Sequence, residues 1–294
     1  MWPLRGRGGG TVTRALTVLA TGPLTTVQDT GRPGQAALGI GRSGACDRAS
    51  AALANRLLGN PPDAAVLEVT LGGLAVRAAA DLLVVTTGAR CAGAVAHDAP
   101  APLRAGEELR LGVPTSGLRT YVGVRGGIDV PPVLGSRSTD VLAGLGPPVV
   151  AVGDVLPVGT SPLPLPGVDL APVADPPGGE VTLPVLPGPR ADWFGPSAWA
   201  TLTGAAYTVT SDSNRVGLRL DGPALQRTVP GELPSEGMVR GALQVPPAGT
   251  PVLFLADHPV TGGYPVVGYV VDDAVDRCAQ LRPGQLLQFR AAPG

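Results

Sequence analysis

The sequence predicts a mainly β protein with only a few short helices. Three observations lead to this fold class. Short runs rich in Val, Leu and Thr recur along the 294 residues, and they end at Gly, Pro or Asp. Glycine (43 residues) and proline (33 residues) supply enough turn residues to separate many short strands. An apolar content of 44% with a net charge of −1 favours a folded chain over a disordered one.

Twelve runs have the composition of strands, and this number of short strands favours sandwiches or barrels. Leu109 and Leu111, and likewise Val122 and Val124, alternate with other residues, as expected of half-buried strands. The predicted strands cover residues 16–21, 66–72, 82–87, 108–113, 120–125, 181–186, 207–211, 218–221, 242–245, 252–256, 266–271 and 286–290.

Three segments are predicted to be helices. The clearest covers residues 47–58, where Asp47 can cap the first turn and Gly59 can end the last. The other two cover residues 273–281 and 197–202. All three are short, so the helices decorate the β structure and do not form a layer of their own.

A proline-rich segment divides the chain into two parts. Residues 157–178 contain seven prolines, which is typical of a semi-rigid spacer. We therefore expect a flexible tail at residues 1–15, a first domain at residues 16–178 that includes the linker, and a second domain at residues 179–294.

The chain also contains one faint internal repeat. Residues 103–111 resemble residues 281–289, and each segment has a Leu-Arg-x-Gly turn that leads into a strand. Shared turn chemistry and duplication both explain such a likeness. Duplication would give two related β domains in tandem.

Composition excludes several classes of function. All 22 basic residues are arginine, so the chain has no lysine for a phosphate-binding P-loop, a Schiff base or biotin attachment. A near-zero charge and 3% aromatic residues argue against a nucleic-acid-binding protein. No apolar run approaches the roughly 18 residues of a membrane span. Three widely spaced cysteines form neither a disulfide framework nor a zinc motif, and a cytoplasmic protein is expected.

Two common catalytic motifs are absent or out of context. Residues 39–44 match G-x-G-x-x-G, but no buried apolar strand precedes them, so a turn explains the glycines better than a dinucleotide. The only histidines are His97 and His258, and no G-x-S-x-G elbow accompanies either. His97 has the surroundings of a loop residue. His258 follows a strand, so a site role and a structural role both stay open. No metal site is expected, because two histidines without a cysteine or acidic cluster are too few.

Three groups of polar residues in glycine-rich loops are candidates for a site. Arginine can hold a carboxylate or phosphate, and aspartate can hold an amide or polarise water. Turn stabilisation, a helix cap and exposed loop hydrogen bonding are the structural alternatives for all of them. The candidates are Gln28, Asp29, Arg32, Ser43 and Asp47 in the first group, Arg137 in the second, and Ser213, Asn214, Arg215, Glu236, Gln244, Asp257, Thr261 and Tyr264 in the third.

Eight segments in a fixed order carry a resemblance to a known family. They are residues 22–34, 43–48, 67–73 and 126–138 in the first part, and residues 185–189, 235–239, 244–247 and 261–265 in the second. From about residue 16 to 290 the chain resembles the carboxyltransferase-domain family that includes the C subunit of 5-oxoprolinase, the second subunit of allophanate hydrolase, and KipA.

The resemblance implies two tandem cyclophilin-like β-barrel domains and a separate partner, the B subunit of 5-oxoprolinase or a KipI-like protein, with a possible A subunit. It implies ATP-dependent opening of the 5-oxoproline lactam to glutamate, with ATP shared by the complex. A non-catalytic KipA-like regulator is one alternative. The other is a carboxyltransferase or allophanate hydrolase-like subunit that acts on a small amide, with any biotin on another chain.

The resemblance also suggests roles for the candidates. Asp29, Asp47 and Glu236 would be catalytic and, with Gln28, hold the amide or orient water, whereas Arg32, Arg137 and Arg215 would hold a carboxylate or phosphate. The remaining candidates would bind substrate. The chain departs from the family at Cys46, where methionine is common, and at Val266, where several members have a basic or polar residue.

Overall fold

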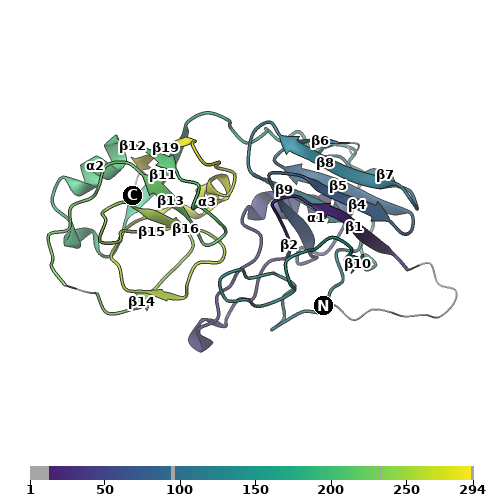
Figure 1. Ribbon diagram of the computed structural model, residues 1–294, viewed down its shortest axis with the longest axis horizontal. Coiled ribbons are helices and arrows are strands. Elements are labelled where there is room, and N and C mark those ends of the chain that lie inside the picture. The colour runs from purple at the N-terminus through teal and green to yellow at the C-terminus, as the bar shows by residue number, and fades with distance from the viewer. Residues whose placement is uncertain (1–12, 94–96, 232, 293–294) are drawn as a thin grey trace.

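The computed structural model describes residues 13–93, 97–231 and 233–292, so most of the predicted tail at residues 1–15 lies outside the described residues. The molecule consists of two β halves side by side, with β1–β10 in the first half and β11–β19 in the second (Figure 1). The prediction of a mainly β protein with few helices is confirmed. None of the helices in these described ranges is long and apolar enough to cross a membrane.

The first half is formed by two five-stranded sheets that face each other. One sheet has the order β10-β1-β4-β8-β6 and the other β2-β3-β9-β5-β7. Leu16, Val76 and Leu109 of one sheet pack against Leu67 and Val122 of the other, which closes an apolar core between them. The strands are β1 (Ala15–Thr21), β2 (Leu24–Gln28), β3 (Val66–Thr70), β4 (Leu74–Ala78), β5 (Leu82–Gly88), β6 (Cys91–Gly93), β7 (Ala101–Leu103), β8 (Glu108–Pro114), β9 (Arg119–Val124) and β10 (Val155–Pro157).

Helix α1 (Arg48–Leu58) packs on the outer face of the second sheet, against β5 and β9. The predicted cap is present, because Asp47 accepts a hydrogen bond from the Ser50 amide at 2.9 Å. A Cβ on Gly123 of β9 would lie 3.0 Å from Leu58 Cδ1, so this glycine lets the helix approach the sheet closely. The 3₁₀ helix η1 (Ala36–Leu38) precedes α1 in a long loop.

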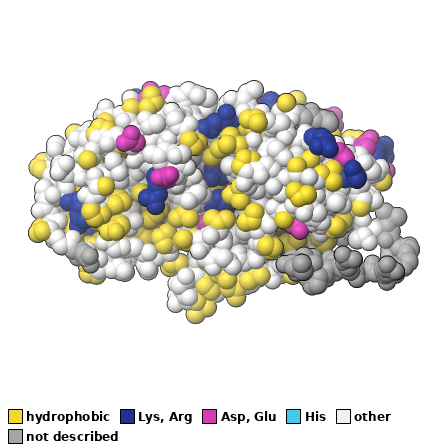
Figure 2. All heavy atoms as spheres, in the orientation of Figure 1, with side chains coloured by type: hydrophobic (Ala, Val, Ile, Leu, Met, Phe, Trp, Pro, Cys, Tyr) yellow, Lys and Arg dark blue, Asp and Glu magenta, His cyan; other side chains and the backbone are white. Residues whose placement is uncertain are grey.

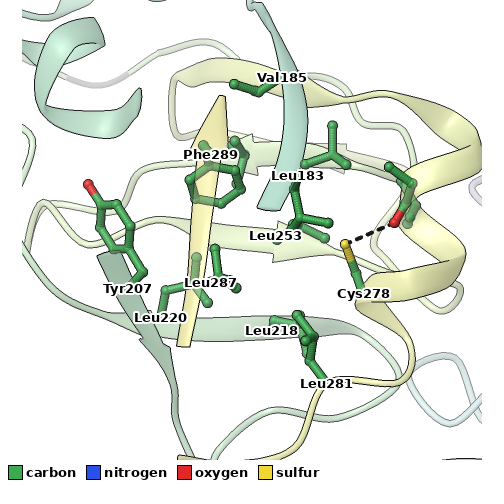
Figure 3. Packing of buried hydrophobic residues seen from close by; sticks show 14 of the residues in the cluster. Leu183, Val185, Tyr207, Leu218, Leu220, Leu253, Cys278, Leu281, Leu287 and Phe289 are labelled. Carbon is green, nitrogen blue, oxygen red and sulfur yellow. Dashed lines mark hydrogen bonds between the residues drawn. The ribbon is translucent and has the colours of Figure 1, made fainter. Parts of the chain in front are cut away.

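The second half is a closed barrel of seven strands in the order β11-β18-β15-β16-β13-β12-β19. Leu183, Tyr207, Leu253 and Phe289 point into its core (Figure 3). The strands are β11 (Val181–Pro187), β12 (Ala206–Val209), β13 (Gly217–Asp221), β15 (Ala242–Gln244), β16 (Val252–Phe254), β18 (Val266–Val270) and β19 (Leu286–Ala291), while β14 (Glu236–Gly237) pairs with β17 (Thr261–Gly262) outside the barrel. The helical segments are η2 (Ala191–Trp193), α2 (Ala198–Gly204) and α3 (Asp272–Cys278).

The two segments that resemble one another in sequence form the same turn. The Glu107 amide donates to the Arg104 carbonyl oxygen at 2.9 Å, and the Gln285 amide donates to the Arg282 carbonyl oxygen at 3.0 Å. Each turn has a glycine at φ +85° in its third position, as in a type II turn. Each turn enters a strand, β8 in the first half and β19 in the second. Turn chemistry alone is therefore sufficient to explain the likeness.

Candidate functional site

A buried ionic network joins the two halves. Arg215 of the second half is fully buried and donates to both carboxylate oxygens of Asp257, at 2.8 and 2.9 Å. It also donates to Glu68 of the first half and to the Gly44 carbonyl oxygen at 2.7 Å. Arg119 lies 3.4 Å from the same Glu68 carboxylate. Two cations therefore balance two carboxylates at the interface, where an unpaired charge would be strongly unfavourable.

Glu68 is the centre of this network. Its carboxylate accepts hydrogen bonds from the Cys46 amide at 2.9 Å and from the Tyr121 hydroxyl at 2.8 Å. Burial raises the pKa of Glu68, but Arg215 and Arg119 lower it more, so the net pKa lies below its usual value. The carboxylate is therefore ionised at neutral pH and unavailable for proton transfer.

Two further predicted site residues belong to the same interface. The Ser43 hydroxyl donates to Asp257 at 2.7 Å, and the backbone of Ser43 has a positive φ of 55°. Asp47 accepts from the Gln280 side chain at 2.7 Å, across the two halves, in addition to capping α1. Burial raises the pKa of Asp47, which these hydrogen bonds oppose. Ser43, Asp47, Arg215 and Asp257 are thus brought together at this interface, where the fold uses their polar groups.

The carboxylate of Asp29 organises a neighbouring loop. One of its carboxylate oxygens accepts from the Ser136 and Ser138 hydroxyls, each at 2.6 Å, and the other accepts from the Arg137 amide at 2.5 Å. Arg137 itself pairs with Asp129 at 2.8 Å and donates to a backbone carbonyl. These contacts stabilise the loop that follows β9, which agrees with the structural alternative for both residues.

Arg32 and Gln28 are buried in the same region but are not fully hydrogen-bonded. Arg32 donates to the Ser138 carbonyl oxygen, whereas its Nη1 has no partner. The Gln28 amide nitrogen donates to Thr26 at 3.0 Å and to the Thr139 carbonyl oxygen at 2.9 Å, and its Oε1 has no partner. Gln28 also lines a hollow of about 170 Å³ beside α1.

The remaining candidates lie on the second half, away from the interface network. Glu236 pairs with Arg190 on the strand pair β14-β17, where Thr261 is exposed. Asn214, Gln244 and Tyr264 line an open groove of about 400 Å³ on the barrel. Ser213 bonds to the backbone of its own turn, at Arg219. The candidates of the third group therefore do not form one site, because they lie at the interface, on the strand pair β14-β17, in the groove of the barrel and in a turn.

A polar hollow of about 400 Å³ lies between the halves, beside the buried network. Arg42, Ser43 and Arg48 line it from the first half, and Arg240 and His258 line it from the second. Arginine side chains are visible in the middle of the molecule, between the two halves (Figure 2). A pocket of this size with several cations at its wall suits a small anionic ligand.

The arginines of this hollow differ in how strongly they are paired. Arg240 donates to Asp276 at 2.5 Å and to the Cys46 carbonyl oxygen at 3.0 Å, so it is held in place. In the part of the chain that the structure describes, the Arg48 guanidinium pairs only with the exposed Asp272, at 3.4 Å. Among the described residues no carboxylate pairs with Arg42, whose Nε donates to a backbone carbonyl at 3.3 Å. Arg42 and Arg48 are thus the cations best able to bind a ligand.

His258 is the titratable group of the hollow that sequence reasoning left open. Its Nδ1 lies 2.8 Å from the Pro259 carbonyl oxygen, and its ring stacks on Phe254 with centroids 6.0 Å apart. Burial and Arg48 lower the pKa of His258, while the contact with Pro259 and the carboxylates of Asp257 and Asp140 oppose the shift. The ring is therefore neutral at pH 7.

Comparison with known proteins gives the family. The sequence model described as carboxyltransferase domain, subdomain A and B, matches residues 38–291. The chain belongs to this family. It is 37% identical to the C subunit of 5-oxoprolinase from Escherichia coli (strain K12), over 93% of this chain and 90% of that protein. It is 32% identical to the urea amidolyase of Lachancea kluyveri, over 94% of this chain but 17% of that protein.

A solved structure supports the same conclusion. The crystal structure of TTHA0988 matches with a TM-score of 0.86 and 33% identity, over 96% of this chain and 56% of that chain. The carboxyltransferase module described above thus spans a little more than half of that solved protein. The family resemblance that the sequence motifs indicated is confirmed.

Sequence reasoning missed several residues of the carboxyltransferase module's interface. Glu68 and Tyr121 lie inside predicted strands, and Gln280 lies at the end of a predicted helix, so each resembles an ordinary element residue. Arg42 lacks a motif of its own, although its position in the glycine-rich segment at residues 39–44 was a usable signal. No group of three or more His, Cys, Asp or Glu side chains that could hold a metal occurs among the described residues.

Proposed function

We propose that this chain is the C subunit of a cytoplasmic, ATP-dependent 5-oxoprolinase, which opens the 5-oxoproline lactam to glutamate together with the B and A subunits. The observation that carries the proposal is the match to a protein of that name over 93% of this chain and 90% of the relative. A match of this extent includes both halves and the hollow between them, so the proposal rests on the whole module and not on one motif.

The polar hollow supports this assignment chemically. A lactam with a carboxylate is small, planar and anionic, and a guanidinium binds carboxylate through two parallel hydrogen bonds. Arg42 and Arg48 would hold the carboxylate, and they lie on the same wall as Ser43. The buried network holds both walls of the hollow in register, which is what precise orientation of a poor electrophile requires.

ATP is proposed as a substrate of the assembled complex. Activation of the amide oxygen by phosphoryl transfer gives the carbonyl carbon a leaving group. Because this chain has no lysine, arginines, backbone amides or a partner protein would contact the phosphates. The same lack of lysine means that biotin is not attached to this chain.

Reconstitution tests the proposal. The purified chain is mixed with the A and B subunits, 5-oxoproline and ATP, and the released glutamate and ADP are measured, with omission of this chain as the control. We expect equal amounts of both products only from the full mixture. Arg42→Gln should raise the KM for 5-oxoproline about 10- to 100-fold, the value of a charge-assisted hydrogen bond. Arg290→Gln, at an exposed position on β19, is the matched control.

A different outcome would assign a different role. If the full mixture forms a stable complex but releases neither glutamate nor ADP, the chain is not part of this enzyme. Binding to the B-like partner that survives Arg42→Gln without turnover would then indicate a KipA-like regulator. Carboxylation of urea in the presence of a biotinylated partner would indicate a role like that of urea carboxylase.

A further inference from the structure

We propose that His258 is the proton acceptor of the polar hollow, and that its Nε2 takes the proton of the water that attacks the amide carbon. The inference deepens the proposed function and rests on it. It assigns a role to His258, for which the sequence left both a site role and a structural role open. Of the two histidines in the chain, only this one lines the hollow between the halves.

The hydrogen bond of the ring fixes its tautomer. Nδ1 of His258 lies 2.8 Å from the carbonyl oxygen of Pro259. A carbonyl oxygen only accepts, so the proton is on Nδ1 and the lone pair of the neutral ring is on Nε2. Within the described ranges no protein group bonds to Nε2, and this atom is not among the buried polar atoms without a partner. The lone pair is therefore accessible to a ligand or water in the hollow.

The position of the ring is fixed from two sides. The imidazole stacks on Phe254 at an angle of 26° between the ring planes. The preceding residue, Asp257, is held by Arg215 and Ser43 and by the Val141 amide at 3.0 Å. A general base is effective only when it is held at the correct distance from the proton that it removes. The network thus positions a residue whose own side chain remains available.

Burial of the ring, more than the charges around it, keeps His258 in the basic form. Burial and Arg48 lower the pKa of His258, whereas the hydrogen bond to Pro259 and the carboxylates of Asp257 and Asp140 raise it. A Cβ built on Gly41 would lie 3.5 Å from the His258 carbonyl oxygen and 3.6 Å from Asp140 Oδ2, so these three loops converge. A neutral imidazole with one acceptor nitrogen results.

The other histidine, His97, differs from His258 in the hydrogen bonding of its ring nitrogens. Its Nδ1 lies 3.1 Å from the Thr86 hydroxyl, and its Nε2 lies 3.1 Å from the Gly88 carbonyl oxygen. Both ring nitrogens are thus used by the fold. No lone pair of His97 is left for proton transfer, which is the property that distinguishes His258.

The proposed step balances without an oxidant or reductant. ATP, the co-substrate of the proposed function, activates the carbonyl oxygen. As the bond from water oxygen to the amide carbon forms, one O–H bond of water breaks and the proton moves to Nε2. When the C–N bond breaks, its electron pair goes to the lactam nitrogen, and the His258 imidazolium returns the proton to that nitrogen. The phosphoryl group stays on the former carbonyl oxygen as an acyl phosphate, and a second water then releases it as phosphate to give glutamate.

The test uses the reconstituted complex with saturating ATP and compares His258→Asn with Val260→Ala. The asparagine amide can still donate to the Pro259 carbonyl oxygen but lacks the Nε2 lone pair. Val260 lines the same wall of the hollow and cannot carry a proton, so its variant reports steric changes alone. Glutamate release is measured from pH 5.5 to 9. A second measurement, ¹⁵N NMR of the imidazole nitrogens, uses the free chain, where only two histidines give signals.

We expect His258→Asn to lower kcat about 10²- to 10⁴-fold with little change in KM, and to remove the fall of kcat at acid pH. Val260→Ala should keep the pH profile. The NMR spectrum should show the proton on Nδ1 of His258. A kcat within threefold of wild type in His258→Asn, or a proton on Nε2 at pH 7, overturns the assignment of His258 alone. An inactive wild-type complex overturns the proposed function and this step together.

Discussion

Replacing Arg215 by methionine should lower the stability of the protein and uncouple the unfolding of its two halves. Methionine keeps most of the volume of the side chain but removes the charge and all four hydrogen-bonded contacts. Glu68 would then be paired with Arg119 alone, at 3.4 Å, and Asp257 would be left as a buried carboxylate without a cation. The loss of unfolding free energy is therefore larger than for an ion pair exposed to solvent.

The magnitude follows from the burial of this network. Removing one partner of a buried ion pair lowers the free energy of unfolding by about 3–5 kcal/mol. A typical domain has about 5–15 kcal/mol in total. With an m-value of about 3 kcal/mol/M in urea, a loss of about 4 kcal/mol lowers the unfolding midpoint by about 1.3 M.

Equilibrium urea unfolding measures this effect with two probes. In a Trp2→Phe background, tryptophan fluorescence reports the second half, because the other two tryptophans of the chain are Trp193 and Trp199. Circular dichroism reports both halves. In Arg215→Met the two transitions should no longer coincide. The matched control is Arg219→Met, because Arg219 is exposed on the nearby strand β13. An unfolding free energy within about 0.5 kcal/mol of that control would refute the role of the network.

Three further predictions concern pH and backbone geometry. Because the pKa of Glu68 is held below its usual value, the stability from this network should be present above about pH 4.5 and lost as pH falls further, which acid unfolding with and without Glu68→Gln measures. Burial raises the pKa of Asp98 from 3.8 to about 6, so stability falls as pH rises through this window and stays lower above it. Asp98→Asn should therefore raise stability by about 1 kcal/mol at pH 8 but not at pH 3.5, measured by thermal unfolding; an equal gain at both pH values would contradict this. Gly22→Ala should cost about 3 kcal/mol or more, because its Cβ would lie 1.9 Å from the Gly72 carbonyl oxygen, whereas Gly34→Ala, which meets nothing within 4 Å, should cost only about 1 kcal/mol of backbone strain.

The strands that the sequence missed were missed for physical reasons. Strand β2 contains Thr-Thr-Val-Gln and is buried over nearly its whole length, so it shows no alternation of apolar and polar residues. Strand β4 is partly built from alanine, which is uncommon in strands. Strands β14 and β17 have two residues each, too few for any periodicity. The structure places a strand at each of the twelve predicted runs.

The candidate site shows a different limit. The motif segments marked the right part of the chain, since Ser43, Asp47, Arg215 and Asp257 all lie at the interface between the halves. Sequence does not tell whether a polar residue in a glycine-rich loop binds a ligand or another residue. That choice depends on which side chains approach from the other half.

By itself the sequence determined the mainly β class, the turns, the capped helix α1 and the family, because these depend on local composition and on the order of motifs. Only the tertiary structure decided which polar groups are free. Glu68 and Arg215 lie 147 positions apart in the chain, yet each occupies the hydrogen-bonding groups of the other. Local propensity contains no information about such a pair, because the energy of a buried charge depends on the partner that the fold brings to it. The same packing that pairs Arg215 leaves Arg42 and the Nε2 of His258 open to the hollow.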